Sequence, residues 1–151
     1  DLHSFPTRRS SDLHIDFEKH RVPERPEDLV HHDCIVYTYG QSPGKWRFQP
    51  RDDGDEIVVP VQGKLQTNNG IVERAAALEG LALCMLPTFY VGDELRSGAL
   101  RAVLRDFPAV ELGIYAVYPQ RRNLSPKVRA YVDYLREQFG DEPYWDRGLF
   151  A

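Results

Sequence analysis

The sequence predicts an α/β fold, in which strands and helices alternate along the chain. Short apolar runs rich in β-branched and aromatic residues recur between about residues 34 and 118. Stretches with helical periodicity lie between several of these runs, and glycine or proline separates most of them. A strand, helix, strand, helix, strand order is typical of a parallel sheet with covering helices.

Length and charge restrict the class of protein. The chain has 151 residues, 42% of them hydrophobic and 28% charged, which is enough for one ordinary core. Its net charge of −4 argues against phosphate binding by this part, because nucleic-acid binding needs clustered lysine and arginine. No run approaches the roughly 18 apolar residues of a membrane span. We expect a soluble globular unit, or part of one, that contacts neither DNA nor membrane.

The first residues are expected to be foreign to the fold. The segment DLHSFPTRRSSDL, residues 1–13, lacks periodicity and capping signals, and it resembles a short-read sequencing adapter translated in one frame. We therefore exclude it from fold prediction, as one excludes tags and fusion joints. If an adapter is joined to His14, the native upstream sequence is lost and the chain is a fragment.

The next region predicts a short helix followed by antiparallel strands. The stretch PERPEDLVHHD places Glu27 and Asp28 in a first helical turn, where the helix dipole favours negative charge. The runs CIVYTY and WRF predict strands separated by the turn QSPGK. After a second turn, RDDGDE, the stretch EIVVPVQGKLQ alternates, and Pro60 favours an edge or bulged position. We expect this alternating stretch to be part of an antiparallel excursion from the main sheet, with one face formed by Ile57, Val59, Val61 and Leu65.

The middle of the chain predicts helix and buried strand in turn. An amphipathic helix is expected over residues 72–80, ended by Gly80. The run LALCMLP that follows predicts a parallel strand covered on both faces. TFYVGDELRSG predicts another helix, and ALRAVL and LGIYAVYP predict two more strands. The first helix should bury Ile71, Ala75 and Leu78, with Val72 and Ala76 beside them, and should expose Glu73, Arg74 and Glu79.

The last helix has the clearest signals in the sequence. Ser125 can cap it, Pro126 suits its first position, and Gly140 can end it. Its apolar positions recur at helical spacing and would form one face: Val128, Tyr131, Val132, Leu135 and Phe139.

The reactive side chains of the sequence do not form a catalytic or metal-binding pattern. HHDC, residues 31–34, has metal-ligand types, but no second Cys or His cluster completes four ligands. Cys34 and Cys84 both lie in apolar runs, which indicates core packing and a reducing compartment such as the cytoplasm. RDDGDE lacks the length and distal glutamate of a calcium loop. We therefore expect no catalytic residues, no metal and no cofactor.

One polar cluster remains, at the junction of a strand and a helix start. Gln66, Thr67, Asn68 and Asn69 precede the helix, whose first N–H groups lack intrahelical partners. Asn68 or Asn69 is expected to be the cap, which explains one position but not four. Loops after strands in open α/β folds often bind small molecules, so a ligand role is the alternative.

Taken in order, these segments resemble the C-terminal part of a LysR-type transcriptional regulator. The resemblance rests on PEDLVHHDCIVYTY, WRF, GKLQTNNGIVERAAALEGLALCMLPTFYVGDELRSGALRAVL and IYAVYPQRRNLSPKVRAYVDYLREQF. It runs from about Pro26 to Phe139. One departure is Gly80-Leu81-Ala82, where many relatives have Gly-x-Gly.

The resemblance implies a periplasmic-binding-protein-like (type II) effector domain, truncated at its N-terminal side. Residues 14–111 would form the second subdomain, and residues 112–151 would hold the returning crossover strand and the last helix of the first subdomain. A small-molecule effector, often anionic, would bind between the subdomains. It implies ligand contacts from Thr67, Asn68, Asn69, Pro87 and Thr88.

It also implies partners outside this chain. The full-length protein would be a homodimer or homotetramer, and it would bind DNA only through an N-terminal domain that this chain lacks. A fragment of a transporter's solute-binding protein is the alternative with the same architecture. An enzyme is less favoured, because the polar cluster offers only neutral groups.

Overall fold

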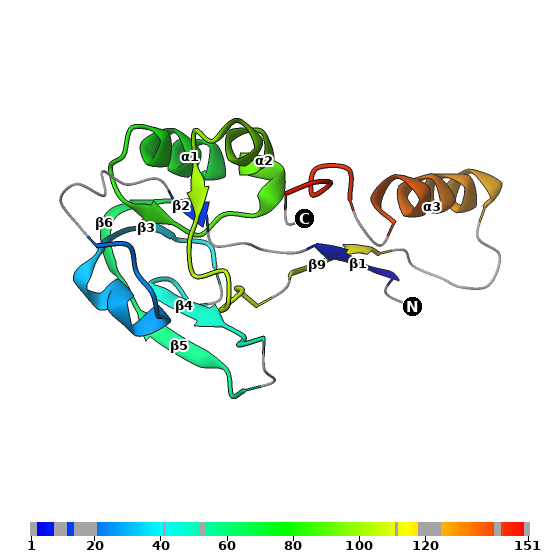
Figure 1. The fold of residues 1–151 in the computed structure, drawn as a ribbon. Helices are drawn as coiled ribbons and strands as arrows, with labels where there is room; N and C mark the ends of the chain where they lie inside the picture. Colours follow the sequence, from blue (N-terminus) through cyan, green and yellow to red (C-terminus); the bar gives the residue numbers. More distant parts are fainter. Residues whose placement is uncertain are drawn as a thin grey trace.

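The structure is a computed structural model that describes residues 3–7, 12–13, 21–40, 42–51, 54–110, 112–117, 125–140 and 143–149. Figure 1 shows its elements. In chain order they are β1 (His3–Thr7), β2 (Asp12–Leu13), the 3-10 helix η1 (Pro26–His31), β3 (Asp33–Tyr37), β4 (Lys45–Phe48), β5 (Ile57–Pro60), β6 (Gln62–Thr67), α1 (Gly70–Leu78), β7 (Leu83–Cys84), α2 (Thr88–Ser97), β8 (Arg101–Ala102), β9 (Leu112–Ala116) and α3 (Pro126–Phe139).

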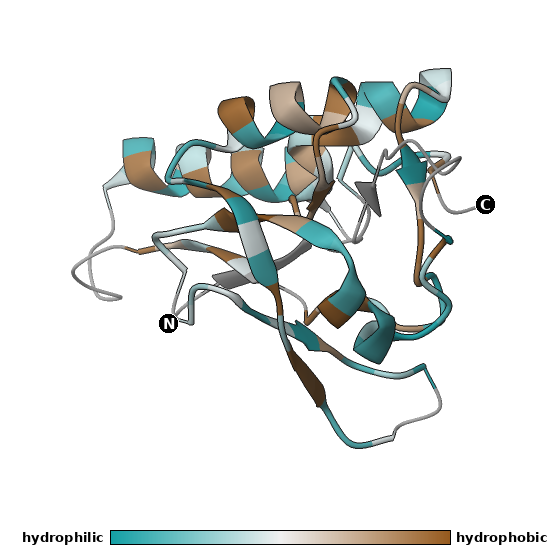
Figure 2. Ribbon diagram, turned by 90° about the vertical axis from the view of Figure 1, so that its left-hand side faces the viewer, coloured by the Kyte–Doolittle hydropathy of each residue, from teal (hydrophilic) through white to brown (hydrophobic). Residues whose placement is uncertain are grey.

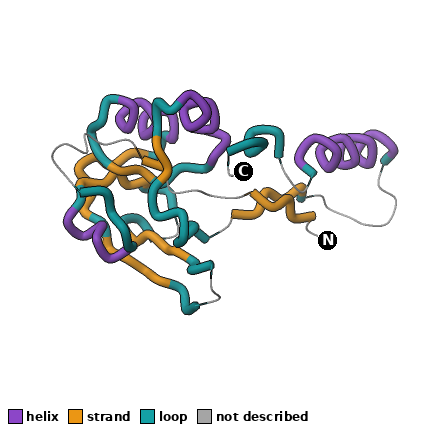
Figure 3. The backbone as a smooth tube through the Cα atoms, in the orientation of Figure 1, coloured by secondary structure: helices purple, strands orange, loops and turns teal. Residues whose placement is uncertain are grey.

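A three-stranded parallel sheet organises the main body of the molecule. Its strand order is β6-β3-β7, so that β3 pairs with β6 on one side and with β7 on the other. Helices α1 and α2 lie together on one side of this sheet, and the antiparallel pair β4–β5 lies on the other (Figures 1 and 3). The predicted α/β class is confirmed.

Two apolar clusters fill the two sides of the sheet. Strands β3 and β7 contribute to both, because successive side chains of a strand point to opposite faces. Cys34 and Leu83 belong to the cluster on the β4–β5 side, together with Phe48 and Trp46. Ile35, Cys84, Ala77 and Val91 belong to the cluster beneath the helices. The predicted parallel strand covered on both faces is therefore confirmed. In Figure 2 the helix ribbons alternate between brown and teal, as expected of amphipathic helices.

The predicted antiparallel excursion is only half right. Strand β5 does pair antiparallel with β4, but β6 pairs parallel with β3. The chain leaves one sheet for the other at Pro60 and Val61, where Pro60 ends β5 and the N–H of Val61 donates to the carbonyl of Gly44 at 2.8 Å. The alternation of EIVVPVQGKLQ hides this change of partner, since apolar residues continue through it. Pro60 itself lies on an edge strand, as predicted.

The predicted buried face of α1 is only partly right, because Ala76 and Leu78 pack partly buried against the cluster beneath the helices but the fully buried positions differ. Ile71 is 62% exposed, whereas Glu73 is only 1% exposed. The buried positions are Gly70, Glu73 and Ala77, so the most deeply buried face is turned away from Ile71 and Ala75. The reason is close packing with Tyr90 on α2. If Gly70 carried a Cβ, that atom would lie only 2.7 Å from the ring carbon Cζ of Tyr90. The start of the helix therefore faces α2 through Gly70.

Helix α3 has the predicted bounds and caps. The Ser125 hydroxyl accepts a hydrogen bond from the Val128 N–H at 3.4 Å, and the helix ends before Gly140. It lies beside β1 and β9, away from α1 and α2 (Figure 1). Of its predicted apolar face, Val132 is buried but Tyr131 is 63% exposed.

Part of the segment 1–13 forms strands, although no element was predicted there. Strand β1 pairs antiparallel with β9, and β2 pairs with β8. Such pairing uses backbone groups and places few demands on the side chains of the added strand. It is therefore compatible with a foreign origin of this segment.

Candidate ligand-binding site

The carboxyl ends of the three parallel strands bring the predicted site residues to one edge of the sheet. Strand β6 ends at Thr67 and leads into α1, while β7 ends at Cys84 and leads into α2. The contact between Gly70 and Tyr90 shows that the starts of the two helices lie side by side. Small molecules bind at this edge in open α/β sheets.

Two of the three polar residues at the carboxyl end of β6, Thr67 to Asn69, make local hydrogen bonds. Asn69 is the N-cap of α1, and its side-chain oxygen accepts from the Ile71 N–H at 2.9 Å. The hydroxyl of Thr67 accepts from the Asn69 N–H at 3.2 Å. Asn68 is exposed, and its side chain makes no hydrogen bond in the described part of the chain. The predicted cap is therefore Asn69, and Asn68 has its donor and acceptor available.

The second predicted pair begins α2. Pro87 occupies the N-cap position with extended backbone angles, and Thr88 is the first helical residue. The Thr88 side chain is only 1% exposed. Both residues lie on the same edge of the sheet as Thr67, but Thr88 points into the body rather than into open solvent.

A groove runs beside α2, between that helix and the turns of residues 143–149. Its volume is about 590 Å³, which lies within the range of small-molecule sites. Of the five predicted residues it includes Thr88 alone. The complete lining is Arg74, Thr88, Phe89, Tyr90, Gly92, Asp93, Glu94, Arg96, Tyr144, Trp145 and Arg147. Sequence reasoning missed the C-terminal wall, since PYWD, residues 143–146, carries no periodicity.

Ion pairs set the charge of this groove. The Arg74 guanidinium donates to the carboxylate of Glu94, joining α1 to α2. This hydrogen bond lowers the pKa of Glu94, against the opposing effect of burial. Arg96 donates to Asp93 at 2.9 Å. Three arginines and two acids line the groove, so an anion would meet a small excess of positive charge there.

The loop after β3 is a further part of the edge that sequence reasoning missed. Because β3 is the central strand, its carboxyl end lies between those of β6 and β7. The Thr38 N–H donates to the Thr67 carbonyl at 2.9 Å, which ties this loop to the predicted site. Tyr37 and Tyr39 are exposed and meet edge to face, with ring centroids 6.4 Å apart. The polar and aromatic run YTYG after a strand was the available signal.

The cysteines and histidines of the described residues do not form a reactive centre. Cys34 and Cys84 are buried in the two core clusters, as predicted. Burial raises the pKa of the Cys34 thiol to about 12, which keeps it protonated near neutral pH. His31 is exposed while His32 is buried, and no group of three or more potential metal ligands occurs among the residues that the structure describes. The same residues contain no helix long and apolar enough to cross a membrane.

Comparisons with known proteins identify the family. Residues 16–140 match the LysR substrate binding domain. The HTH-type transcriptional regulator PtxR of Pseudomonas aeruginosa is 32% identical over 120 residues, which cover 80% of this chain and 38% of PtxR. A putative transcriptional regulator of the same organism is 35% identical over 122 residues, covering 80% of this chain and 39% of the relative. The chain thus spans well under half the length of these relatives.

Solved structures of regulatory domains have the same fold. The regulatory domain of AphB from Vibrio vulnificus, treated with cumene hydroperoxide, superimposes with a TM-score of 0.71 at 25% identity, covering 91% of this chain and 68% of that one. The CrgA regulatory domain from Neisseria meningitidis gives a TM-score of 0.72 at 22% identity, covering 92% and 70%. This likeness confirms the expected periplasmic-binding-protein-like (type II) fold. Because the family match extends over most of the sequence, the chain belongs to the LysR substrate-binding domain family.

Proposed function

We propose that this chain binds a small metabolite, often anionic, at the carboxyl edge of β6-β3-β7. The observation that carries the proposal is the convergence of two helix starts and their polar residues, Thr67–Asn69 and Pro87–Thr88, on that edge. Helix N-termini and uncharged amides bind carboxylates well. The excess of arginine in the adjoining groove supports the preference for an anion.

The proposed division into subdomains follows the LysR substrate-binding domain family. Residues 14–111 would form the second subdomain, and β9 with α3 would belong to the first. The position of α3 beyond β9, away from α1 and α2, supports this division. Ligand binding would favour one relative orientation of the two subdomains, shifting an existing equilibrium.

The remaining functions would lie outside this chain. DNA binding would come from an N-terminal domain, and regulation would operate in a cytoplasmic homodimer or homotetramer. The relatives PtxR and the putative transcriptional regulator of Pseudomonas aeruginosa favour a regulator over a solute-binding protein and over an enzyme.

Ligand screening by thermal shift tests the proposed site. We expect some members of a panel of small mono- and dicarboxylates to raise the Tm of the chain, since a ligand that binds only the folded state stabilises it. Asn68→Ala should abolish most of that shift while leaving the unliganded Tm almost unchanged, because the Asn68 side chain is exposed and makes no hydrogen bond to the residues that the structure describes.

The matched control is Gln62→Ala, at the amino end of β6 and so at the opposite edge of the sheet. It should leave the ligand-induced shift intact. Equal ligand-induced shifts in the parent chain and Asn68→Ala would place the bound carboxylate elsewhere and contradict the proposed site.

A further inference from the structure

The turns of residues 143–149, called the strap below, are held against α2 by specific contacts. Arg96 on α2 donates one hydrogen bond to the carbonyl of Trp145 at 2.6 Å and another to that of Arg147 at 3.5 Å. Its second terminal nitrogen binds Asp93 one turn earlier, which fixes the direction of the guanidinium. The strap is also folded within itself, since the Asp146 N–H donates to the Pro143 carbonyl at 2.9 Å.

A glycine in the middle of α2 permits this contact. An ideal Cβ on Gly92 would lie 2.9 Å from the carbonyl oxygen of Trp145, closer than real Cβ atoms approach a backbone oxygen. Glycine is otherwise unfavourable inside a helix, and Gly92 lies well inside α2 (Thr88–Ser97). The gap left by its absent side chain accommodates the strap.

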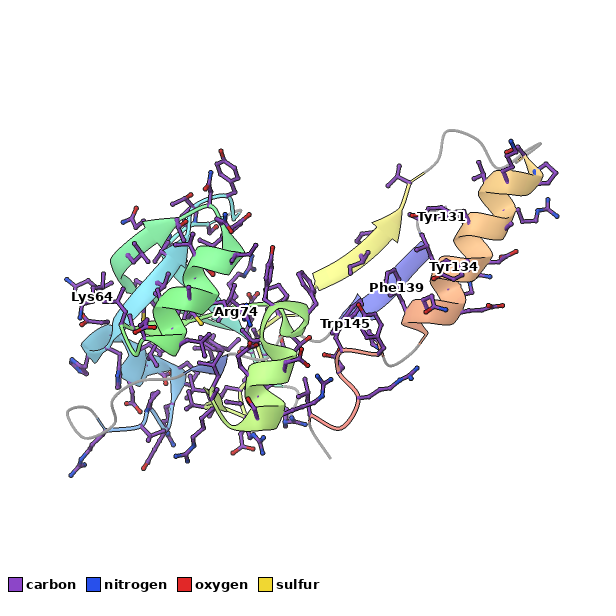
Figure 4. The ribbon with its side chains drawn as sticks, turned by 90° about the horizontal axis from the view of Figure 1, so that it is seen from above. Lys64, Arg74, Tyr131, Tyr134, Phe139 and Trp145 are labelled. Atoms are coloured by element: carbon purple, nitrogen blue, oxygen red, sulfur yellow. The ribbon has the colours of Figure 1, made fainter. Side chains whose placement is uncertain are left out.

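The indole of Trp145 contacts rings from both α2 and α3. Its centroid lies 6.0 Å from that of Phe89 on α2, at an interplanar angle of 79°. It lies 5.3 Å from that of Phe139, in the last turn of α3, at 60°. Tyr144 packs on it edge to face at 4.8 Å. Figure 4 shows Phe139 and Trp145 next to each other where α3 meets the strap.

We propose that the strap is a conformational latch, in which Trp145 couples the position of α3 to that of α2. Edge-to-face ring pairs have a preferred geometry, so a displacement of either helix strains the contact with Trp145. The strap also forms the outer wall of the groove that contains Thr88. Occupancy of the groove would therefore reach α3 through the strap. That last link rests on the proposed function, whereas the latch itself requires no ligand.

The fluorescence of Trp145 reports whether the strap is docked. The chain has two tryptophans, so Trp46→Phe leaves Trp145 as the only tryptophan, whose emission is excited selectively at wavelengths that tyrosine does not absorb. In that background Gly92→Ala should shift the emission to the red and increase its quenching by acrylamide, because the new Cβ displaces the Trp145 carbonyl. The far-UV circular dichroism of the chain should show no loss of helix, because alanine favours helix more than glycine does.

Hydrogen exchange then reports whether α3 responds. The amides of α3 (Pro126–Phe139) should exchange faster in Gly92→Ala, although the substitution lies in α2, while the amides of α1 keep their protection. Arg96→Met removes the hydrogen bonds to the strap without adding volume, and it should produce the same two changes to a smaller extent.

The control is Gly40→Ala, since a Cβ there would lie no closer than 3.8 Å to a neighbouring atom. It should change neither the emission of Trp145 nor the exchange of α3. Unchanged emission in both Gly92→Ala and Arg96→Met would show that the strap is not docked as proposed. Two results would overturn the coupling. One is a displaced Trp145 with unchanged hydrogen exchange in α3, and the other is an equal loss of amide protection in α1 and α3.

Discussion

The contribution of the Arg74–Glu94 ion pair to the stability of the fold should depend on pH. The hydrogen bond from Arg74 lowers the pKa of Glu94, so the folded state favours the carboxylate more than the unfolded state does. A lowered pKa contributes stability above the usual carboxyl pKa, and this contribution is lost as the pH falls through the folded value. Because the Glu94 side chain is largely buried, its ion pair with Arg74 should contribute more to the free energy of unfolding than an exposed ion pair does.

Glu94→Gln should therefore lower the free energy of unfolding at neutral pH by about 1–3 kcal/mol, the contribution typical of a hydrogen bond to a charged group. The loss should shrink at acid pH, as the pH falls through the lowered folded-state pKa of Glu94 and the parent carboxyl becomes protonated. Urea denaturation at both pH values measures this. Asp93→Asn, which alters an i,i+3 pair whose carboxylate side chain is 94% exposed, should change the free energy by less than about 0.5 kcal/mol. Equal losses for Glu94→Gln at the two pH values would rule out the ionic origin.

The sequence was more informative about single capping residues than about the whole site. Asn69 and Ser125 could be predicted as caps because capping depends on local spacing. The groove could not be predicted, since it requires the strap to return to α2 across 51 residues, as in the contact between Arg96 and Arg147. Thr38 was likewise missed, because its place beside Thr67 depends on β3 being the central strand.

Among the secondary-structure elements, α1 and α2 depend on a close approach at Gly70. We expect Gly70→Ala to destabilise the chain by about 1–3 kcal/mol, because its Cβ would force the Tyr90 ring to move. Helix propensity alone would make the same substitution stabilising by up to about 1 kcal/mol. The sign of the change in the free energy of unfolding therefore shows which of the two effects is larger.

A double-mutant cycle measured by urea denaturation isolates the contact. In a Tyr90→Leu background the obstructing ring is gone, so Gly70→Ala should become neutral or stabilising. The same cost in both backgrounds would mean that the penalty arises elsewhere on α1.

The elements differed in how far their sequence determined them. The bounds of α3 followed from its caps and from its regular apolar spacing. The buried face of α1 did not, because Ala75, Ala76 and Ala77 give little hydrophobic contrast around the helix and packing with Tyr90 decided its rotation. Strand β6 was assigned to the wrong partner, since an alternating pattern specifies which face is buried but not which strand lies alongside.

At the scale of the whole molecule, the arrangement leaves one helix with an uncovered aromatic face. Tyr131 and Tyr134 project from α3, and Val128 is also exposed, while Val132 is buried (Figure 4). Exposed apolar surface on one helix favours association, because each contact removes that surface from water. We expect the purified 151-residue chain to self-associate through α3 as its concentration rises.

Sedimentation velocity over a concentration series tests this expectation. Tyr131→Ser with Tyr134→Ser should shift the distribution towards monomer, because both side chains lie on the uncovered face. Tyr39→Ser is the matched control, since Tyr39 is at least as exposed but lies at the carboxyl edge of β3, far from α3 in the fold. It should leave the association unchanged. A parent chain that stays monomeric at every concentration, or one whose association responds equally to Tyr39→Ser, would show that α3 is not the surface through which copies meet.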